Sequence, residues 1–312
     1  MTETKPDKVG TDTAARRPRG GGAGRAGHRR VQRTRQALQR MRGNLNGRLV
    51  TGMTMLFTVL LLALLAPVLA THDPLEIDML NRLEPPSATH WMGTDENGRD
   101  VYSRVIHGSR VSIAVGFSVV LTTTLLGALV GLTSGYYNTA DKILMRFIDA
   151  FMSFPSILLA IAVMAALGAS PRNVVIALTI TYMPLTARVV RGRVLSIREE
   201  TYIESARALG FGDTRIISRY VLPNCLAPLV VQATFVLALA IIAEAGLSFI
   251  GAGTPPPTPS WGNILSDGRQ FMRQAEWMTI FPGLFIMFSV LSLNILGDGL
   301  RDALDPRLKD QG

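Results

Sequence analysis

Six long apolar stretches, almost free of charged side chains, dominate this sequence of 312 residues. Roughly 20 apolar residues in a helix cross the ~30 Å hydrocarbon core of a membrane. Backbone groups in lipid must bond within the protein, and the stretches lack the alternation of barrel strands. The pattern therefore predicts an all-α integral membrane protein with six transmembrane helices. The predicted spans are residues 49–70, 112–136, 150–167, 173–190, 226–250 and 278–296.

Charge indicates how these spans are oriented. Residues 1–48 hold 13 Lys and Arg against 3 Asp and Glu, a net charge of +10, and cytoplasmic flanks of membrane proteins collect Lys and Arg. We therefore expect the N-terminus in the cytoplasm, and six crossings return the C-terminus to the same side. The loop 191–224 is then cytoplasmic too. The predicted organisation is a basic tail over 1–48, a six-helix transmembrane domain over 49–297 and a cytoplasmic tail over 298–312.

The basic tail has two interpretations. Residues 29–48 carry seven Arg, and such a segment beside a first span is usually a topology determinant. It can also lie on anionic lipid headgroups, at about 1 kcal/mol per charge. Nucleic-acid binding is the alternative that clustered basic residues suggest. We expect a lipid contact and no nucleic-acid partner.

The cytoplasmic loop contains a polar segment with a helix–break–helix pattern. Residues 204–209 are good helix formers, and Gly210 and Gly212 are expected to stop this helix. Asp213 is expected to cap a second helix, and Pro223 to end it. A folded turn at the membrane face suits docking better than it suits a substrate pathway. The plainer alternative is an amphipathic connector between two spans.

The spacing Glu-x-Ala-x3-Gly-x9-Tyr-x-Leu-Pro of this segment resembles the EAA loop of bacterial ABC import permeases. In that family the loop forms a short coupling helix that seats in a groove of a separate cytoplasmic ATPase. Ser205 and Tyr220 depart from the usual Ala and Ile but keep their size or apolar character. The resemblance implies an ATPase-docking site. Its residues are Glu204, Ser205, Ala206, Gly210, Leu222 and Pro223.

Residues from about 90 to 307 resemble, more specifically, the DppC/OppC-like permease subunits of dipeptide, oligopeptide and nickel ABC importers. The resemblance implies a type I, MetI-like importer fold in the bacterial cytoplasmic (inner) membrane. It also implies a DppB/OppB-like sister permease as heterodimer partner, two ATPase subunits and an extracytoplasmic substrate-binding protein. Short peptides are the implied cargo, and nickel or another small solute is the alternative. The matching segments beyond the EAA loop are residues 93–95, 98–100, 243–251, 255–262 and 296–306.

We expect no catalytic residue, bound cofactor or metal in this chain. The phosphate-binding signature G-x-x-x-x-G-K-[ST] is absent from the sequence, so ATP and Mg²⁺ are expected on the partner ATPases. The single cysteine, Cys225, excludes an intramolecular disulfide and a multi-thiolate metal site. A self-sufficient secondary transporter is the rival class, but such proteins usually show intramembrane charges or internal repeats near the midplane. No repeat is evident here.

Three charged residues are candidate gate or pathway residues. Glu244 lies in the fifth predicted span, about 27 Å from its start at ~1.5 Å per residue, and an ionisable residue inside a span is a candidate functional site. A structural role is the alternative for it. Asp100 and Arg104 lie one helical turn apart in the first external loop, where Thr94 or Asp95 is expected to cap a helix.

Overall fold

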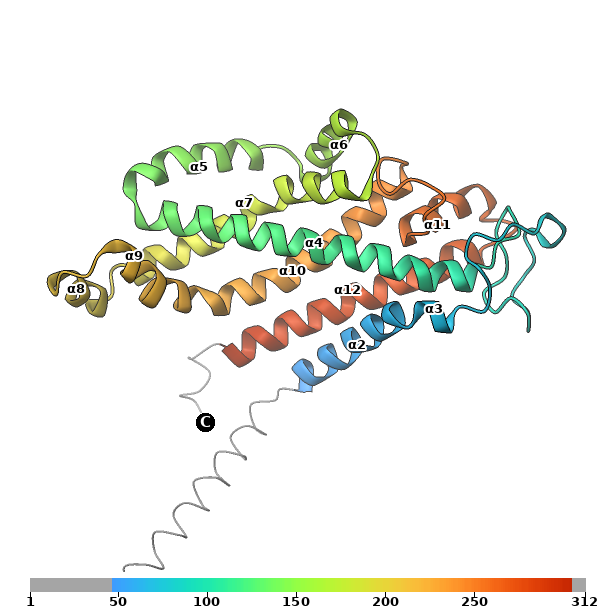
Figure 1. The fold of residues 1–312 in the computed structure, drawn as a ribbon, viewed down its shortest axis with the longest axis horizontal. Helices are drawn as coiled ribbons and strands as arrows, with labels where there is room; N and C mark the ends of the chain where they lie inside the picture. Colours follow the sequence, from blue (N-terminus) through green and yellow to red (C-terminus); the bar gives the residue numbers. More distant parts are fainter. Residues whose placement is uncertain (1–46, 305–312) are drawn as a thin grey trace, which may run out of the picture. The chain divides into compact units, whose positions relative to one another are not determined.

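The computed structural model describes residues 47–304, and this part of the chain is built from helices (Figure 1). The predicted all-α class is confirmed, whereas the basic N-terminal tail up to residue 46 and the last eight residues lie outside the described part. The helices, in chain order, are α2 (Gly47–Leu64), α3 (Ala66–Leu69), η1 (Met79–Asn81), α4 (Val101–Tyr136), α5 (Asn138–Met152), α6 (Ser156–Leu167), α7 (Pro171–Ile197), α8 (Thr201–Ala208), α9 (Asp213–Ile216), η2 (Ile217–Val221), α10 (Leu222–Phe249), α11 (Trp261–Gly268), η3 (Arg269–Phe271) and α12 (Trp277–Leu304).

Five of the described helices are long and apolar enough to cross a membrane: α2, α4, α7, α12 and the continuous helix of 37 residues from Asp213 to Phe249. The pair α5 and α6 passes the same test only when taken together, and it is bent by 92°. The predicted span 150–167 straddles this bend and is therefore not a straight helix. Pro155 explains the break, because it lacks an N–H donor and disfavours a helical conformation at Phe154.

Two other helix ends differ from the prediction. Helix α4 begins at Val101 rather than at residue 112, because Asp100 caps it and its charged first turns are buried in polar contacts. Helix α12 continues to Leu304 instead of ending at residue 296. Gly297 and Gly299 do not stop α12; they let other backbone and side-chain atoms approach. A Cβ on Gly299 would lie 2.7 Å from the backbone of Leu49 in α2.

Close packing of small residues joins α4 to α7. Gly127, Gly131 and Gly135 lie on one face of α4, four residues apart. A Cβ at any of the three would come within 2.6–2.7 Å of atoms in α7. Helices in lipid associate through such close approach, since apolar burial gains little there.

The two ends of the bundle carry different structures (Figure 1). Helices α8 and α9 lie at one end, where their buried side chains join those from the C-terminal parts of α4 and α7. The connecting segment between α3 and α4 lies at the other end together with α11. There Trp261 of α11 is fully buried and donates from Nε1 to the carbonyl oxygen of Val105, at 3.1 Å. Every candidate site residue belongs to one of these ends or to the helices between them.

Candidate functional site

The segment that resembles the EAA loop folds as a helix, a turn and a second helix; we call residues 201–221 the elbow. Helix α8 ends at Ala208. Gly210 follows with φ +78°, in the left-handed region that L-residues rarely adopt. Its N–H donates to the Arg207 carbonyl at 2.9 Å, and the Phe211 N–H donates to the Ala206 carbonyl at 3.1 Å. This pair of bonds is the Schellman motif, so Gly210 stops α8 as the sequence predicted.

The elbow is anchored to the bundle through one buried face. Ile203 and Ala206 of α8 are buried, and they share an apolar cluster with Ile216, Val221 and residues of α4 and α7. A polar bond strengthens this anchor at the end of α4. There the Tyr136 hydroxyl donates to Asp213 Oδ1 at 2.8 Å.

Cations also pack on aromatic rings around the elbow. The Arg207 guanidinium lies 5.5 Å from the centre of the Tyr136 ring, and Arg215 lies 4.4 Å from that of Phe211. Such cation–π contacts are worth about 0.5–1 kcal/mol each when exposed. The Arg207 contact, together with the apolar cluster, holds α8 against the end of α4, whereas the Arg215 contact lies within the elbow.

The opposite face of the elbow is exposed. Glu204, Ser205 and Gly210 face outward, and the Leu209 side chain at the turn is 74% exposed. An apolar tip on a rigid turn, beside charged side chains, is suited to insertion into a groove of another protein. The sequence did not single out Leu209, because only the fold shows that the helix ends with this side chain unpacked.

Two local predictions about this segment are wrong. Asp213 does not cap α9; Gly212 occupies the cap position and the Asp213 carboxylate accepts the Tyr136 bond instead. Pro223 does not end the second helix, since it lies in the first turn of α10 beside Leu222. The turn before Pro223 accommodates it: η2 is π-helical, and the Leu222 N–H donates to the Ile217 carbonyl five residues back. The chain therefore runs from α9 into α10 through the π-helical turn η2 without a break.

At the other end of the bundle, Arg104 is buried in a cluster of ion pairs. It contacts Asp95, and its Nη2 lies 3.1 Å from Asp267 Oδ2. Arg99 joins the same cluster through Asp95, at 2.6 Å. Burial, with the Asp95 charge beside it, raises the pKa of the Glu96 carboxyl in this segment. Arg104 thus connects the segment before α4 to α11, which carries Asp267.

Asp100 has a different role from its neighbour Arg104. Its Oδ2 accepts the Ser103 N–H at 2.8 Å, so Asp100, rather than Thr94 or Asp95, caps α4. Its Oδ1 faces two histidines, His72 and His90. Asp100 and Arg104 therefore have separate sets of partners, and neither is paired with the other.

Glu244 is fully buried between helices and has hydroxyl partners on both oxygens. Ser112 of α4 donates to Oε2 at 2.9 Å, and Ser248 donates to Oε1 at 2.8 Å. Thr254 adds a longer bond to Oε1 at 3.4 Å. These contacts connect α4, α10 and the segment after α10, and in this arrangement the carboxylate has no exposed surface.

The fold defines the class of the protein: it is a helical membrane permease, and the elbow is built into the chain between α7 and α10. The family model for the binding-protein-dependent transport system inner membrane component matches residues 123–310, and the chain belongs to this family. It is thus a multi-pass, non-catalytic inner-membrane subunit of an ABC importer. In such an importer separate ATPase subunits bind ATP, and a binding protein supplies the substrate.

Curated relatives resemble most of the chain. A putative peptide transport system permease protein of Brucella suis is 49% identical over 84% of this chain and 88% of its own length. The dipeptide transport system permease protein DppC of Alkalihalophilus pseudofirmus is 46% identical, over 83% and 86%. The glutathione transport system permease protein GsiD of Pectobacterium atrosepticum is 45% identical, over 81% and 86%.

A solved structure resembles the fold. Inward-facing MetNI, a methionine ABC transporter, aligns with a TM-score of 0.52 at 22% identity, over 64% of this chain and 96% of the MetNI chain. This likeness confirms the predicted MetI-like permease fold.

Proposed function

We propose that this chain forms half of the translocation pathway of an importer for short peptides, beside a DppB/OppB-like sister permease. The relatives described above are named for peptide, dipeptide and glutathione transport. Glutathione is itself a tripeptide, so the three names share one class of cargo. Because these proteins match the chain over more than four fifths of its length, the common cargo class supports short peptides here.

We propose further that the elbow docks onto an ATPase subunit. The observation that carries this proposal is the Schellman turn at Gly210, which presents Leu209 outward while Ile203 and Ala206 anchor α8 to the bundle. Closure of the ATPases would then move the elbow, and with it α10, as one body. This movement would convert an inward-open cavity between the two permeases into an outward-open one.

The docking proposal requires the elbow to lie in the cytoplasm. Charge supports this orientation, because the tail before α2 is strongly basic. The start of α2 also lies beside the end of α12: Arg48 is 3.7 Å from Asp302. Both ends of the described chain would then be cytoplasmic, with the bent pair α5–α6 counted as one span.

Accessibility of single cysteines tests the orientation. Leu209 in the elbow is 74% exposed, and Leu80 at the other end is 94% exposed, so the two form a matched pair. In a chain whose buried Cys225 is replaced by Ser, a membrane-impermeant maleimide added to whole spheroplasts should label Leu80→Cys but not Leu209→Cys. Labelling of Leu209→Cys from outside would overturn the docking proposal.

Uptake by the assembled transporter tests the cargo. Proteoliposomes that contain both permeases, the ATPases and the binding protein should take up labelled di- and tripeptides when ATP is present on the ATPase side. The chain alone should give no uptake. ATP-independent accumulation by the chain alone would instead favour a secondary transporter.

A further inference from the structure

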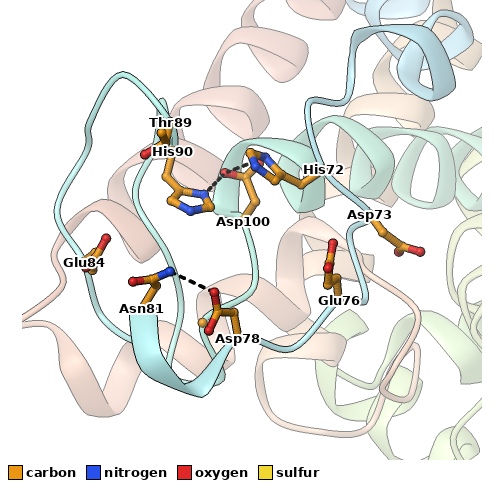
Figure 2. A pocket seen from close by; sticks show the side chains of 10 residues that line it. His72, Asp73, Glu76, Asp78, Asn81, Glu84, Thr89, His90 and Asp100 are labelled. Atoms are coloured by element: carbon orange, nitrogen blue, oxygen red, sulfur yellow. Dashed lines mark hydrogen bonds and ion pairs between the residues drawn. The ribbon is translucent and has the colours of Figure 1, made fainter.

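A second site lies at the end of the bundle away from the elbow, where three residues from different parts of the chain meet (Figure 2). His72 follows α3, His90 lies in the segment between η1 and α4, and Asp100 is the cap of α4. His90 Nδ1 is 2.9 Å from Asp100 Oδ1, and His72 Nδ1 is 3.9 Å from the same oxygen. The two imidazole rings stack with centroids 4.7 Å apart.

From this geometry we infer that His72, His90 and Asp100 form a binding site for a transition-metal dication, with Zn²⁺ as the reference ion. One ligand atom from each residue lies within 4.8 Å of the other two. Zn²⁺ binds nitrogen and oxygen ligands at about 2.0 Å in a tetrahedron, which places the ligands ~3.3 Å apart. The two His–Asp100 distances, 2.9 and 3.9 Å, bracket this value, and rotation of the stacked rings would bring the ion into the plane of each imidazole.

The contacts around the site leave Asp100 Oδ1 to the two histidines, whereas His72 Nδ1 also lies 3.0 Å from Thr71 Oγ1, a hydrogen bond that a metal ion would replace. The other oxygen of Asp100 is held by the Ser103 N–H at 2.8 Å, so Oδ1 is available to an ion without loss of the helix cap. The backbone N–H of His72 donates to Ser103 Oγ at 3.1 Å, which places the His72 ring beside the carboxylate. Metal binding would replace the proton that His90 shares with Asp100, and that proton would leave to solvent.

Charge around the site favours a cation. The three residues line one side of a cavity of about 370 Å³, whose wall carries four further carboxylates and no Lys or Arg. These carboxylates are at Asp73, Glu76, Asp78 and Glu84 (Figure 2).

The donor set selects the class of metal. Two imidazole nitrogens with one carboxylate suit Zn²⁺, Ni²⁺ or Cu²⁺, whereas Mg²⁺ and Ca²⁺ prefer oxygen ligands alone. Three protein ligands leave a fourth position for water or for a group that enters the cavity. A bound ion would fasten the segment between α3 and α4 to the first turn of α4.

Metal binding by the purified full-length chain tests this inference. The chain should carry a tag without histidine, be treated with chelator and be dialysed against Zn²⁺ in the presence of a competing chromogenic chelator. We expect one tightly bound Zn²⁺ per chain. His72→Gln and His90→Gln should each weaken binding more than about tenfold, since even the loss of a residue that only orients a ligand costs 10- to 100-fold.

His107→Gln is the matched control. His107 lies in α4 one turn after Ser103, its Nδ1 contacts the Ser103 carbonyl oxygen at 3.1 Å, and it is not among the residues that line the cavity, so its removal should leave Zn²⁺ affinity unchanged. Equal Zn²⁺ binding by the wild type and the double variant His72→Gln/His90→Gln would overturn the inference. So would the absence of stoichiometric binding by the wild type.

A spectroscopic measurement on the wild type covers the case in which the variants do not fold. Co²⁺ in a tetrahedral site with nitrogen ligands absorbs visible light far more strongly than octahedral aqueous Co²⁺. We expect the strong bands to appear up to one equivalent of Co²⁺ and to disappear when Zn²⁺ is added. A weak octahedral spectrum at one equivalent would contradict the proposed site.

Discussion

Replacing Gly210 by Ala isolates the contribution of the backbone turn to docking. Gly210 has φ +78°, yet a Cβ there would meet nothing within 4 Å. The substitution therefore adds no clash and removes no contact. An L-residue in the left-handed region costs roughly 1–2 kcal/mol. If the ATPase binds only the closed Schellman turn, this cost reduces affinity by about 5- to 30-fold, because ~1.4 kcal/mol corresponds to a factor of ten.

Gly212 provides the control for this prediction. It also has open space around its Cβ position, but its φ of −68° suits any residue. Gly212→Ala should therefore bind the ATPase as the wild type does. Gly210→Asn should lie between wild type and Gly210→Ala, since Asn tolerates the left-handed region better than Ala.

Surface plasmon resonance would measure the affinity of the purified ATPase subunit for permease heterodimers in nanodiscs. Peptide uptake would be measured in parallel. Membrane insertion should be the same for all three variants, since α8 and its turn lie outside the apolar spans. An affinity of Gly210→Ala within about twofold of both the wild type and Gly212→Ala would refute the argument that the turn conformation controls docking.

Three further predictions concern the bundle and the segment before α4. Gly131→Val should lower the midpoint of thermal unfolding in detergent, because its side chain would overlap α7, whereas Gly192→Ala, with open space around it, should not. Glu244→Ala should lower the free energy of unfolding by about 1–3 kcal/mol, because it leaves buried hydroxyls without an acceptor. Glu244→Gln keeps one acceptor oxygen and should lower it less. An equal loss of stability in both variants would contradict this. Burial and the Asp95 charge raise the pKa of Glu96 in the folded chain above its value in the unfolded chain. The free energy of unfolding therefore falls as pH rises from the unfolded pKa through the folded pKa. Glu96→Gln should therefore raise the unfolding midpoint more at about pH 8 than at about pH 5, and the reverse order would refute the assignment.

The local parts of the fold could be predicted from the sequence. Within residues 47–304, each apolar run overlaps a long helix or, for 150–167, the bent pair α5–α6, and the spacing around Gly210 predicted the helix–turn–helix of the elbow. Helix ends were predicted poorly where tertiary contacts decide them. Gly299 looks like a helix stop, but its contact with Leu49 makes it a packing position inside α12. Arg104 precedes the apolar run that predicts the second span, yet burial among carboxylates keeps it inside α4.

Contacts between distant residues could not be predicted at all. Ser112 and Glu244 are 132 positions apart, and only helix packing brings the hydroxyl to the carboxylate. The histidine cluster was missed for the same reason. His72 and His90 have no motif spacing, and they meet Asp100 only because the segment before α4 folds back on the first turn of that helix.

The unbroken helix from Asp213 to Phe249 has a mechanical consequence. At ~1.5 Å per residue its 37 residues form a rod about 56 Å long. If the rod pivots near its centre by about 5°, Glu244 shifts by roughly 1.7 Å. A displacement of that size exceeds what the 2.9 Å bond from Ser112 can absorb, so the bond must break. Ser248 lies on the same helix as Glu244 and moves with it, so the Ser112 bond to α4 is the contact that opposes such a pivot.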